Sequence, residues 1–200
     1  MQLNGLVLIG GKSSRMGIDK SQIAYHGKAH RCYLSEQLLA VGCEQVYWSC
    51  SKTDVDTPAT YPIIRDQYEA VGPIAAVLAA FELNRLAAYF ILGCDYPLID
   101  ESTLKQLINA RNTAKQATIF QHPESRYLEP LLAIYEPSAF AAIRVAFESG
   151  QKSLRKILNE LEVQIVIPNQ PNKLVNANTP AQRDATLRDL EILRSSSFED

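Results

Sequence analysis

Short runs of apolar residues alternate along the chain with longer segments in which apolar residues recur at helical spacing. Residues 3–9 form an apolar run that ends at a pair of glycines, and residues 87–93 are apolar throughout, so both segments are predicted to be buried strands. The same criteria predict extended segments at residues 45–50, 62–65, 116–121, 128–135 and 163–167. Helical spacing and capping signals predict helices at residues 30–41, 73–86, 99–111, 137–148, 153–161 and 180–193.

This alternation of strands and helices predicts an α/β fold. Strands as apolar as these are typical of a mainly parallel sheet that helices cover on both faces, which gives three layers in a Rossmann-like arrangement. Crossovers between parallel strands are expected to be right-handed. Residues 1–194 are expected to form a single domain and residues 195–200 a frayed polar tail. Residues 149–173 would suit a small subdomain, although no linker marks a boundary there.

Composition and charge narrow the class of protein. The 200 residues carry 20 Lys and Arg against 22 Asp and Glu, a formal charge of −2, so the chain lacks the basic field of a nonspecific nucleic-acid binder. No apolar run approaches the ~20 residues of a transmembrane helix, and the N-terminus does not resemble a secretory signal. The cysteines fit no zinc spacing and are expected to be buried reduced thiols: Cys32, Cys43, Cys50 and Cys94. We therefore expect a cytoplasmic protein that binds neither nucleic acid nor membranes.

The segment after the first predicted strand carries the most informative chemistry. Gly10 and Gly11 let the backbone approach an anion closely and present successive N–H groups. Arg15 and Lys20 supply the positive charge that a triphosphate requires, and ligands of open α/β sheets bind at the carboxyl ends of strands. Two commoner phosphate loops are excluded, because the first glycine of G-x-x-x-x-G-K-[ST] would fall at Leu6 and G-x-G-x-x-G is absent. The loop is therefore predicted to bind a nucleoside triphosphate; the alternative is a solvated turn with incidental charge.

The sequence of this loop resembles a family signature. Residues 6–20, LVLIGGKSSRMGIDK, are similar to the form L-x-G-G-x-S-x-R-M-G-x-D-K of the molybdenum cofactor guanylyltransferase family, with Ile9 where the family usually has Ala. The wider group of nucleotidyltransferases, which includes sugar-nucleotide pyrophosphorylases, shares a looser version. Ala75-Ala76 departs from the Ala-Gly that the family often has. The further motifs follow in the family's order along nearly the whole chain: Ile64-Arg65-Asp66, Gly72-Pro73-Ile74, Cys94-Asp95-Tyr96-Pro97 and Asn176-Ala177-Asn178-Thr179-Pro180.

The resemblance implies roles for residues at the predicted strand ends. Asp95 follows an apolar strand, so its carboxylate is expected in the ligand crevice, and in the family this aspartate binds Mg²⁺. Asp66 matches an aspartate that contacts the nucleotide, and a carboxylate accepts hydrogen bonds from both donors on the pairing edge of guanine. Asn176 and Asn178 are candidates for contact with the acceptor. The implied catalytic residues are Arg15, Lys20 and Asp95, and the implied nucleotide site comprises Leu8, Ile9, Gly10, Gly11, Lys20, Asp66 and Asp95.

Each of these residues also has a purely structural interpretation. Asp95 suits a turn before a proline, Lys20 an exposed surface lysine, and Leu8 the core. Asparagines in a loop before a helix cap are commonly structural. Ser49 or Ser51 stands near the position where the family often has a nucleotide-contacting Asn, but neither residue matches it.

The resemblance implies a Mg²⁺-dependent nucleotidyltransferase that moves GMP from GTP onto the terminal phosphate of molybdenum-bound molybdopterin and releases pyrophosphate. It also implies transient contacts with cofactor-synthesis proteins or molybdoenzymes. Two alternatives stay open. One is transfer of CMP to molybdopterin, or of a nucleotide to a sugar or alcohol phosphate. The other is a non-catalytic member that only binds nucleotide or cofactor.

Overall fold

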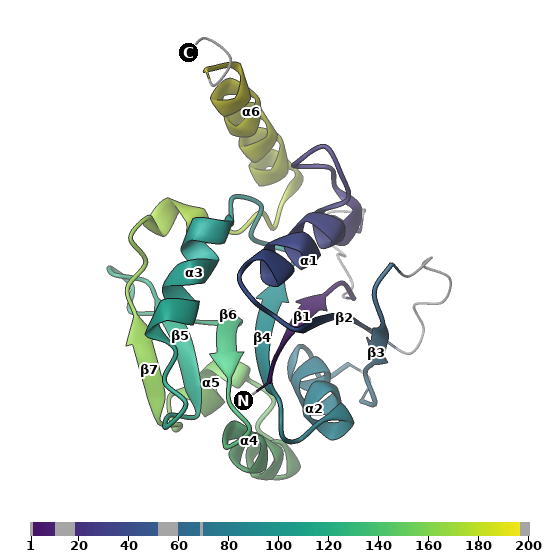
Figure 1. The fold of residues 1–200 in the computed structure, drawn as a ribbon, viewed down its shortest axis with the longest axis vertical. Coiled ribbons are helices and arrows are strands. Elements are labelled where there is room, and N and C mark those ends of the chain that lie inside the picture. The colour runs from purple at the N-terminus through teal and green to yellow at the C-terminus, as the bar shows by residue number, and fades with distance from the viewer. Residues whose placement is uncertain (1, 11–18, 52–59, 69, 197–200) are drawn as a thin grey trace.

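The computed structural model describes residues 2–10, 19–51, 60–68 and 70–196. Within these residues, seven strands form one sheet in the order β3-β2-β1-β4-β6-β5-β7 (Figure 1). All of them run in the same direction except β6, which pairs antiparallel with both β4 and β5. The strands are β1 (Leu3–Leu8), β2 (Gln45–Cys50), β3 (Ile63–Arg65), β4 (Ala88–Gly93), β5 (Ala117–Gln121), β6 (Leu128–Tyr135) and β7 (Val163–Val166).

The reversed direction of β6 follows from the connection that precedes it. Residues 122–127 alone join β5 to β6, and a connection this short returns the chain antiparallel to the strand that it left. The backbone N–H of His122 donates to the carbonyl oxygen of Tyr127 at 2.8 Å and closes this connection. The prediction of a mainly parallel sheet is confirmed, with one strand reversed.

Helices cover both faces of the sheet, as predicted. Two helices, α1 and α3, lie on one face, and α2, α4 and α5 lie on the other, while α6 extends away from the sheet (Figure 1). No helix in the described part of the chain is long and apolar enough to cross a membrane. The helices are α1 (His30–Ala40), α2 (Ile74–Leu83), α3 (Glu101–Ala110), α4 (Ala139–Glu148), α5 (Leu154–Leu158) and α6 (Pro180–Ser196), with 3₁₀ turns η1 (Lys20–Gln22) and η2 (Pro171–Leu174).

The central strands are apolar because both of their faces are buried. Along β1, Leu6 packs into the core under α2 and α4, and Val7 packs into the core under α1 and α3. Successive side chains of a strand point to opposite faces, so a strand between two helical layers needs apolar residues at every position. All six residues of β4 are buried for this reason.

Most element boundaries fall close to their predicted positions, and the differences have local causes. The helix α2 ends at Leu83 rather than at residue 86, because Asn84 adopts an extended backbone. The helix α5 is a short piece within predicted residues 153–161. The helix α6 continues to Ser196, so residues 195 and 196 are helical rather than part of the expected tail. Within residues 149–173, β7 pairs with β5 and so belongs to the main sheet.

A buried ion pair fastens the end of β6 to the end of α3. Glu136 is fully buried and accepts hydrogen bonds from Nε and Nη2 of Arg111 at 2.6 and 2.9 Å. If one partner is removed, the charge of the other stays buried with no water to solvate it. By contrast, the pair Lys115–Glu162 is exposed on both sides.

We predict that Glu136→Ala lowers the free energy of unfolding by about 3 kcal/mol, because it leaves the Arg111 guanidinium unpaired beside the core. The matched change Glu162→Ala should cost less than about 1 kcal/mol, because solvent screens that pair. Urea unfolding followed by circular dichroism measures both values. Equal losses in the two variants would contradict the importance of the buried pair.

Candidate active site

Of the predicted nucleotide residues, Leu8, Ile9 and Gly10 lie at the edge of the sheet where the parallel strands end. Leu8 at the end of β1 lies opposite Ser49 of β2 on one side and Gly93 of β4 on the other. The backbone N–H groups of Ile9 and Gly10 both donate to the carbonyl oxygen of Ser49, at 2.9 and 3.1 Å. Open α/β sheets bind their ligands beyond this edge. Leu8 and Ile9 are half-buried there and Gly10 is exposed.

Two predicted residues, Gly11 and Arg15, lie outside the described residues. The chain is described again from Asp19, whose carboxylate accepts a hydrogen bond from the backbone N–H of Ser21 at 2.9 Å and caps η1. Lys20 begins this turn, and its Nζ donates to Oδ1 of Asn178 at 2.6 Å. The predicted phosphate-binding lysine therefore contacts a residue that the sequence assigned to the acceptor.

Asp95 occupies the turn after β4, and one oxygen of its carboxylate has no hydrogen-bond partner among the described residues. This oxygen, Oδ1, is buried. Burial raises the pKa of this carboxyl group, the positive charge of Lys20 acts to lower it, and the negative charge of Glu129 acts to raise it. A Cβ atom on Gly93 would lie only 2.7 Å from Oδ1, so the glycine provides the space that this oxygen occupies.

The segment 176–178 is bound to the Asp95 turn. The backbone N–H of Ala177 donates to the backbone oxygen of Asp95 at 2.9 Å. The side-chain oxygen of Asn176 is also buried without a partner among the described residues. Two unpaired oxygens on joined segments, with Asn178 holding Lys20 beside them, are suited to a hard cation and a phosphate.

A capping box at the start of α6 holds Asn178 in place. The hydroxyl of Thr179 accepts from the N–H of Gln182 at 3.2 Å, and Oε1 of Gln182 accepts from the N–H of Thr179 at 3.0 Å. The same Oε1 accepts from the N–H of Asn178 at 2.9 Å. The helix start that the sequence predicts therefore also orients a residue of the site.

The described residues fit a metal site that relies on a bound substrate. They contain no group of three or more His, Cys, Asp or Glu residues that would suit a metal ion by itself. Mg²⁺ typically takes only one or two carboxylates and completes its shell with phosphate oxygens and water. The single unpaired carboxylate oxygen of Asp95 meets that requirement.

Asp66 lies at the other end of the same edge. It follows β3, and Ser49 donates its hydroxyl to Oδ1 of Asp66 at 2.8 Å. Three strand spacings separate β3 from β4, which amounts to roughly 14 Å. This is comparable to the extent of a nucleotide from its base to its polyphosphate. Ser49, which matched the family poorly in sequence, thus has a defined role in holding Asp66.

The departure at Ala75-Ala76 lies inside a helix. Both residues are buried in the first turn of α2. Gly72 precedes this helix with a φ of 81°, a conformation that favours glycine, and Pro73 forms the N-cap. Gly72 and Pro73 therefore lead into α2, and the two alanines are buried within the helix.

A cavity of about 460 Å³ opens beside the Asp95 turn. It takes in Asn176 and Glu129, and three basic side chains line it: His122, Lys152 and Arg155. The Arg155 guanidinium stacks over the ring of Tyr127, 4.6 Å from the ring centroid. This cavity was not predicted from the sequence, because its residues come from four separate segments: Pro73, residues 122–131, residues 152–155 and Asn176. The one available signal was Glu129, a charge within an otherwise mostly apolar strand.

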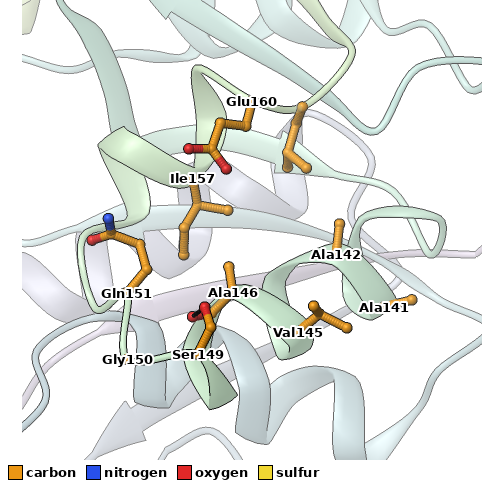
Figure 2. A pocket seen from close by; sticks show the side chains of 10 residues that line it. Ala141, Ala142, Val145, Ala146, Ser149, Gly150, Gln151, Ile157 and Glu160 are labelled. Atoms are coloured by element: carbon orange, nitrogen blue, oxygen red, sulfur yellow. Dashed lines mark hydrogen bonds between the residues drawn. The ribbon is translucent and has the colours of Figure 1, made fainter.

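A second pocket, of about 820 Å³, takes in none of the predicted site residues. Small apolar side chains of α4, Ala142, Val145 and Ala146, lie on one side of it, and Ile157 of α5 lies on the other (Figure 2). Glu160 is the one charged residue in its lining. This lining offers no cation to a phosphate, in contrast to the cavity beside Asp95.

The fold and the site together define a class. A mainly parallel sheet between two helical layers, with a glycine pair after the first strand and an aspartate after a central strand, fits an α/β nucleotidyltransferase. The model of the MobA-like NTP transferase domain matches residues 5–165, and the chain belongs to that family.

Individual relatives agree with this assignment. The chain is 30% identical over 180 residues to the molybdenum cofactor guanylyltransferase of Pseudomonas syringae pv. syringae, with 88% of each chain covered. It is 33% identical over 180 residues to the molybdenum cofactor biosynthesis bifunctional protein of Synechocystis sp., where the match covers 89% of this chain and 52% of that protein, about half its length. The crystal structure of molybdopterin-guanine dinucleotide biosynthesis protein A from Archaeoglobus fulgidus shares the fold, with a TM-score of 0.75 at 23% identity and coverage of 96% and 99%.

We predict that Gly93→Ala weakens Mg²⁺-dependent binding of GTP by about tenfold or more, because the added methyl group displaces Oδ1 of Asp95. Calorimetric titration with GTP, with and without Mg²⁺, measures this effect. Gly5→Ala is the matched control: its Cβ would lie 2.9 Å from Leu38 in the core, away from the site, and should lower stability without changing nucleotide affinity. A Gly93→Ala variant with the Mg²⁺ dependence of the wild type would contradict the proposed position of the carboxylate.

Proposed function

We propose that this protein transfers GMP from GTP onto the terminal phosphate of molybdenum-bound molybdopterin, forming the guanine dinucleotide cofactor and pyrophosphate. The observation that carries the proposal is the buried, unpaired Oδ1 of Asp95, which lies at the carboxyl edge of the sheet next to Lys20 and the acceptor asparagines. Membership of the MobA-like NTP transferase family and the similarity to the Pseudomonas molybdenum cofactor guanylyltransferase support it.

The arrangement of carboxylates along the edge favours GTP. A nucleotide whose phosphates lie at Lys20 and Asp95 would extend its base along the strand ends toward Asp66. The pairing edge of guanine presents a ring N–H and an amino group side by side, and a carboxylate accepts from both, whereas cytosine lacks this donor pair. The hydroxyl of Ser49 fixes the Asp66 carboxylate for that contact.

The site residues fit Mg²⁺, held through Asp95 with the side-chain oxygen of Asn176 close by. The ion would supply positive charge to the triphosphate and to the leaving pyrophosphate. Lys20 adds charge on the same side, and its bond to Asn178 keeps the ammonium group at the site before substrate binds. Arg15, which lies outside the described residues, is proposed to stabilise the leaving pyrophosphate in the same manner.

The reaction needs no covalent enzyme intermediate. An oxygen of the acceptor's phosphate attacks the α-phosphorus of GTP in line, a new P–O bond forms, and the bond to the β-phosphate oxygen breaks. Because a phosphate monoester has its second pKa near 6, the attacking group is already mostly dianionic at about pH 7 and requires no strong base. The residues of the site therefore act by positioning the two phosphates and neutralising their charge.

The cavity of about 460 Å³ is the proposed place of the acceptor. Its basic side chains Lys152 and Arg155 favour an anionic ligand, and Asn176 joins it to the Asp95 turn. A phosphate that enters this cavity thus approaches the nucleotide site from the side of β6. We also propose that Asn176 and Asn178 contact the acceptor, as the sequence predicts.

We also propose the compartment of the reaction and the partners of the protein. The four cysteines form no disulfide in the described structure, and three of them are buried and Cys32 is half-buried, which suits the reducing cytosol that we propose as the compartment. Contacts with cofactor-synthesis proteins or molybdoenzymes are proposed because the product is delivered to such partners. Nucleic acid and membranes are not proposed as partners.

We predict that the wild type binds GTP with Mg²⁺ more tightly than CTP, ATP or UTP, and that Asp66→Ala removes at least about tenfold of this preference. Asp66→Asn is the sharper variant, because it keeps an acceptor for Ser49 but replaces one acceptor by a donor. Calorimetry with the four nucleotides measures both. A wild-type preference for CTP or UTP would assign another branch of nucleotidyl transfer, and an unchanged preference in both variants would remove Asp66 from base recognition.

We predict that Asp95→Ala abolishes the release of pyrophosphate from GTP and molybdopterin while the circular dichroism spectrum stays that of the wild type. The reason is that the variant loses the carboxylate that holds the metal against the phosphates. Rates close to those of the wild type would contradict the metal assignment. A wild type that binds GTP but releases no pyrophosphate would support the non-catalytic alternative.

A further inference from the structure

Three side chains form a continuous chain of polar contacts from the cavity to the Asp95 turn. Tyr96 is 2% exposed and donates its hydroxyl to Oε2 of Glu129 at 2.7 Å. The other carboxylate oxygen of Glu129, Oε1, lies 2.8 Å from Nε2 of His122. Tyr96 directly follows Asp95 in the sequence, whereas His122 and Glu129 line the cavity of about 460 Å³.

Burying these three polar side chains costs free energy, which indicates that they have a role beyond packing. Glu129 is nearly buried, with a side chain 13% exposed, in a strand whose other residues are mostly apolar. A buried carboxylate destabilises a protein unless partners satisfy it, and here both oxygens have partners. Glu129 also places a second negative charge near Asp95, which an apolar residue at this position would avoid.

A nearby tyrosine shows what a purely structural arrangement looks like. Tyr135, fully buried on the same strand β6, donates its hydroxyl to the backbone oxygen of Pro130 at 2.9 Å. That bond uses an existing backbone acceptor and involves no charge. Tyr96 instead bonds to a charged side chain whose other oxygen pairs with a cavity residue.

We propose that the chain Tyr96–Glu129–His122 couples occupancy of the acceptor cavity to the position of the Asp95 carboxylate, so that an anionic phosphate-bearing acceptor and Mg²⁺-bound GTP strengthen each other's binding. The inference rests on the proposed function. Tyr96, Glu129 and His122 act here as positioning residues and do not contact the reacting atoms.

The coupling arises because the first ligand to bind orders side chains that the second ligand would otherwise have to order. An acceptor held by Lys152 and Arg155 packs against the wall that carries His122 and Glu129, and reduces the freedom of both side chains. His122 contacts Glu129, and Glu129 accepts a hydrogen bond from Tyr96. Restricting His122 and Glu129 therefore also restricts Tyr96 and the neighbouring Asp95. The second ligand then meets a turn that is already ordered and loses less conformational entropy on binding. Coupling free energies of this kind usually correspond to changes in affinity of about five- to 150-fold.

The test compares two tyrosine variants that each lose one buried hydroxyl. Calorimetry measures the affinity of guanosine 5′-(α,β-methylene)triphosphate with Mg²⁺, in which the bond to be broken is blocked, with and without molybdopterin. Inorganic phosphate in place of molybdopterin shows whether an anion alone suffices. We expect molybdopterin to raise the nucleotide affinity of the wild type about tenfold. This gain should vanish in Tyr96→Phe and persist in Tyr135→Phe.

His122→Ala provides a second variant, because the side chain of His122 is partly exposed at the cavity wall. It should lose the coupling as Tyr96→Phe does. Equal gains in the wild type, Tyr96→Phe and His122→Ala would overturn the proposal. So would the absence of any gain in a wild type that transfers GMP to molybdopterin. A wild type without GMP transfer would instead count against the proposed function.

Discussion

One oxygen of the Asp95 carboxylate is buried without a hydrogen-bond partner among the described residues, and the proposed chemistry of the site depends on it. A desolvated carboxylate is unfavourable unless positive charge lies nearby, which Lys20 supplies in part and a bound cation would complete. Two features keep this oxygen open to a ligand. Gly93 leaves the space that it occupies, and the bond from Ala177 fixes the backbone of Asp95 rather than its side chain.

The proposed binding regions for the base and for the acceptor lie on either side of this carboxylate along the edge of the sheet. Toward β3, the strand ends lead to Asp66 and Ser49, at a distance suited to the base of a nucleotide. Toward β6, the basic cavity meets the same turn through Asn176 and through the bonds of Glu129. The reversed strand β6 therefore matters to the proposed function, because it brings a cavity wall beside the end of β4.

Much of this arrangement could be predicted from the sequence, because the signals were local. An apolar run such as β4 identifies a buried strand, and the acid after it identifies the ligand edge. The capping box at Thr179 identifies the start of α6. The cavity and the bond between Tyr96 and Glu129 could not be predicted, because these residues are 33 positions apart and meet only through the pairing of β4 with β6. The predicted roles of Gly11 and Arg15 stay predictions, since both residues lie outside the described part of the chain.

The most direct test of the proposed role of Asp95 is to locate the metal ion in a complex with nucleotide. Crystals grown with Mn²⁺ in place of Mg²⁺ and with the α,β-methylene analogue of GTP would show the ion by its anomalous scattering. The account predicts a manganese ion within about 2.5 Å of a carboxylate oxygen of Asp95, with phosphate oxygens of the nucleotide completing its shell. A bound nucleotide whose manganese ion lies away from Asp95, or that has no manganese ion at all, would contradict the central claim.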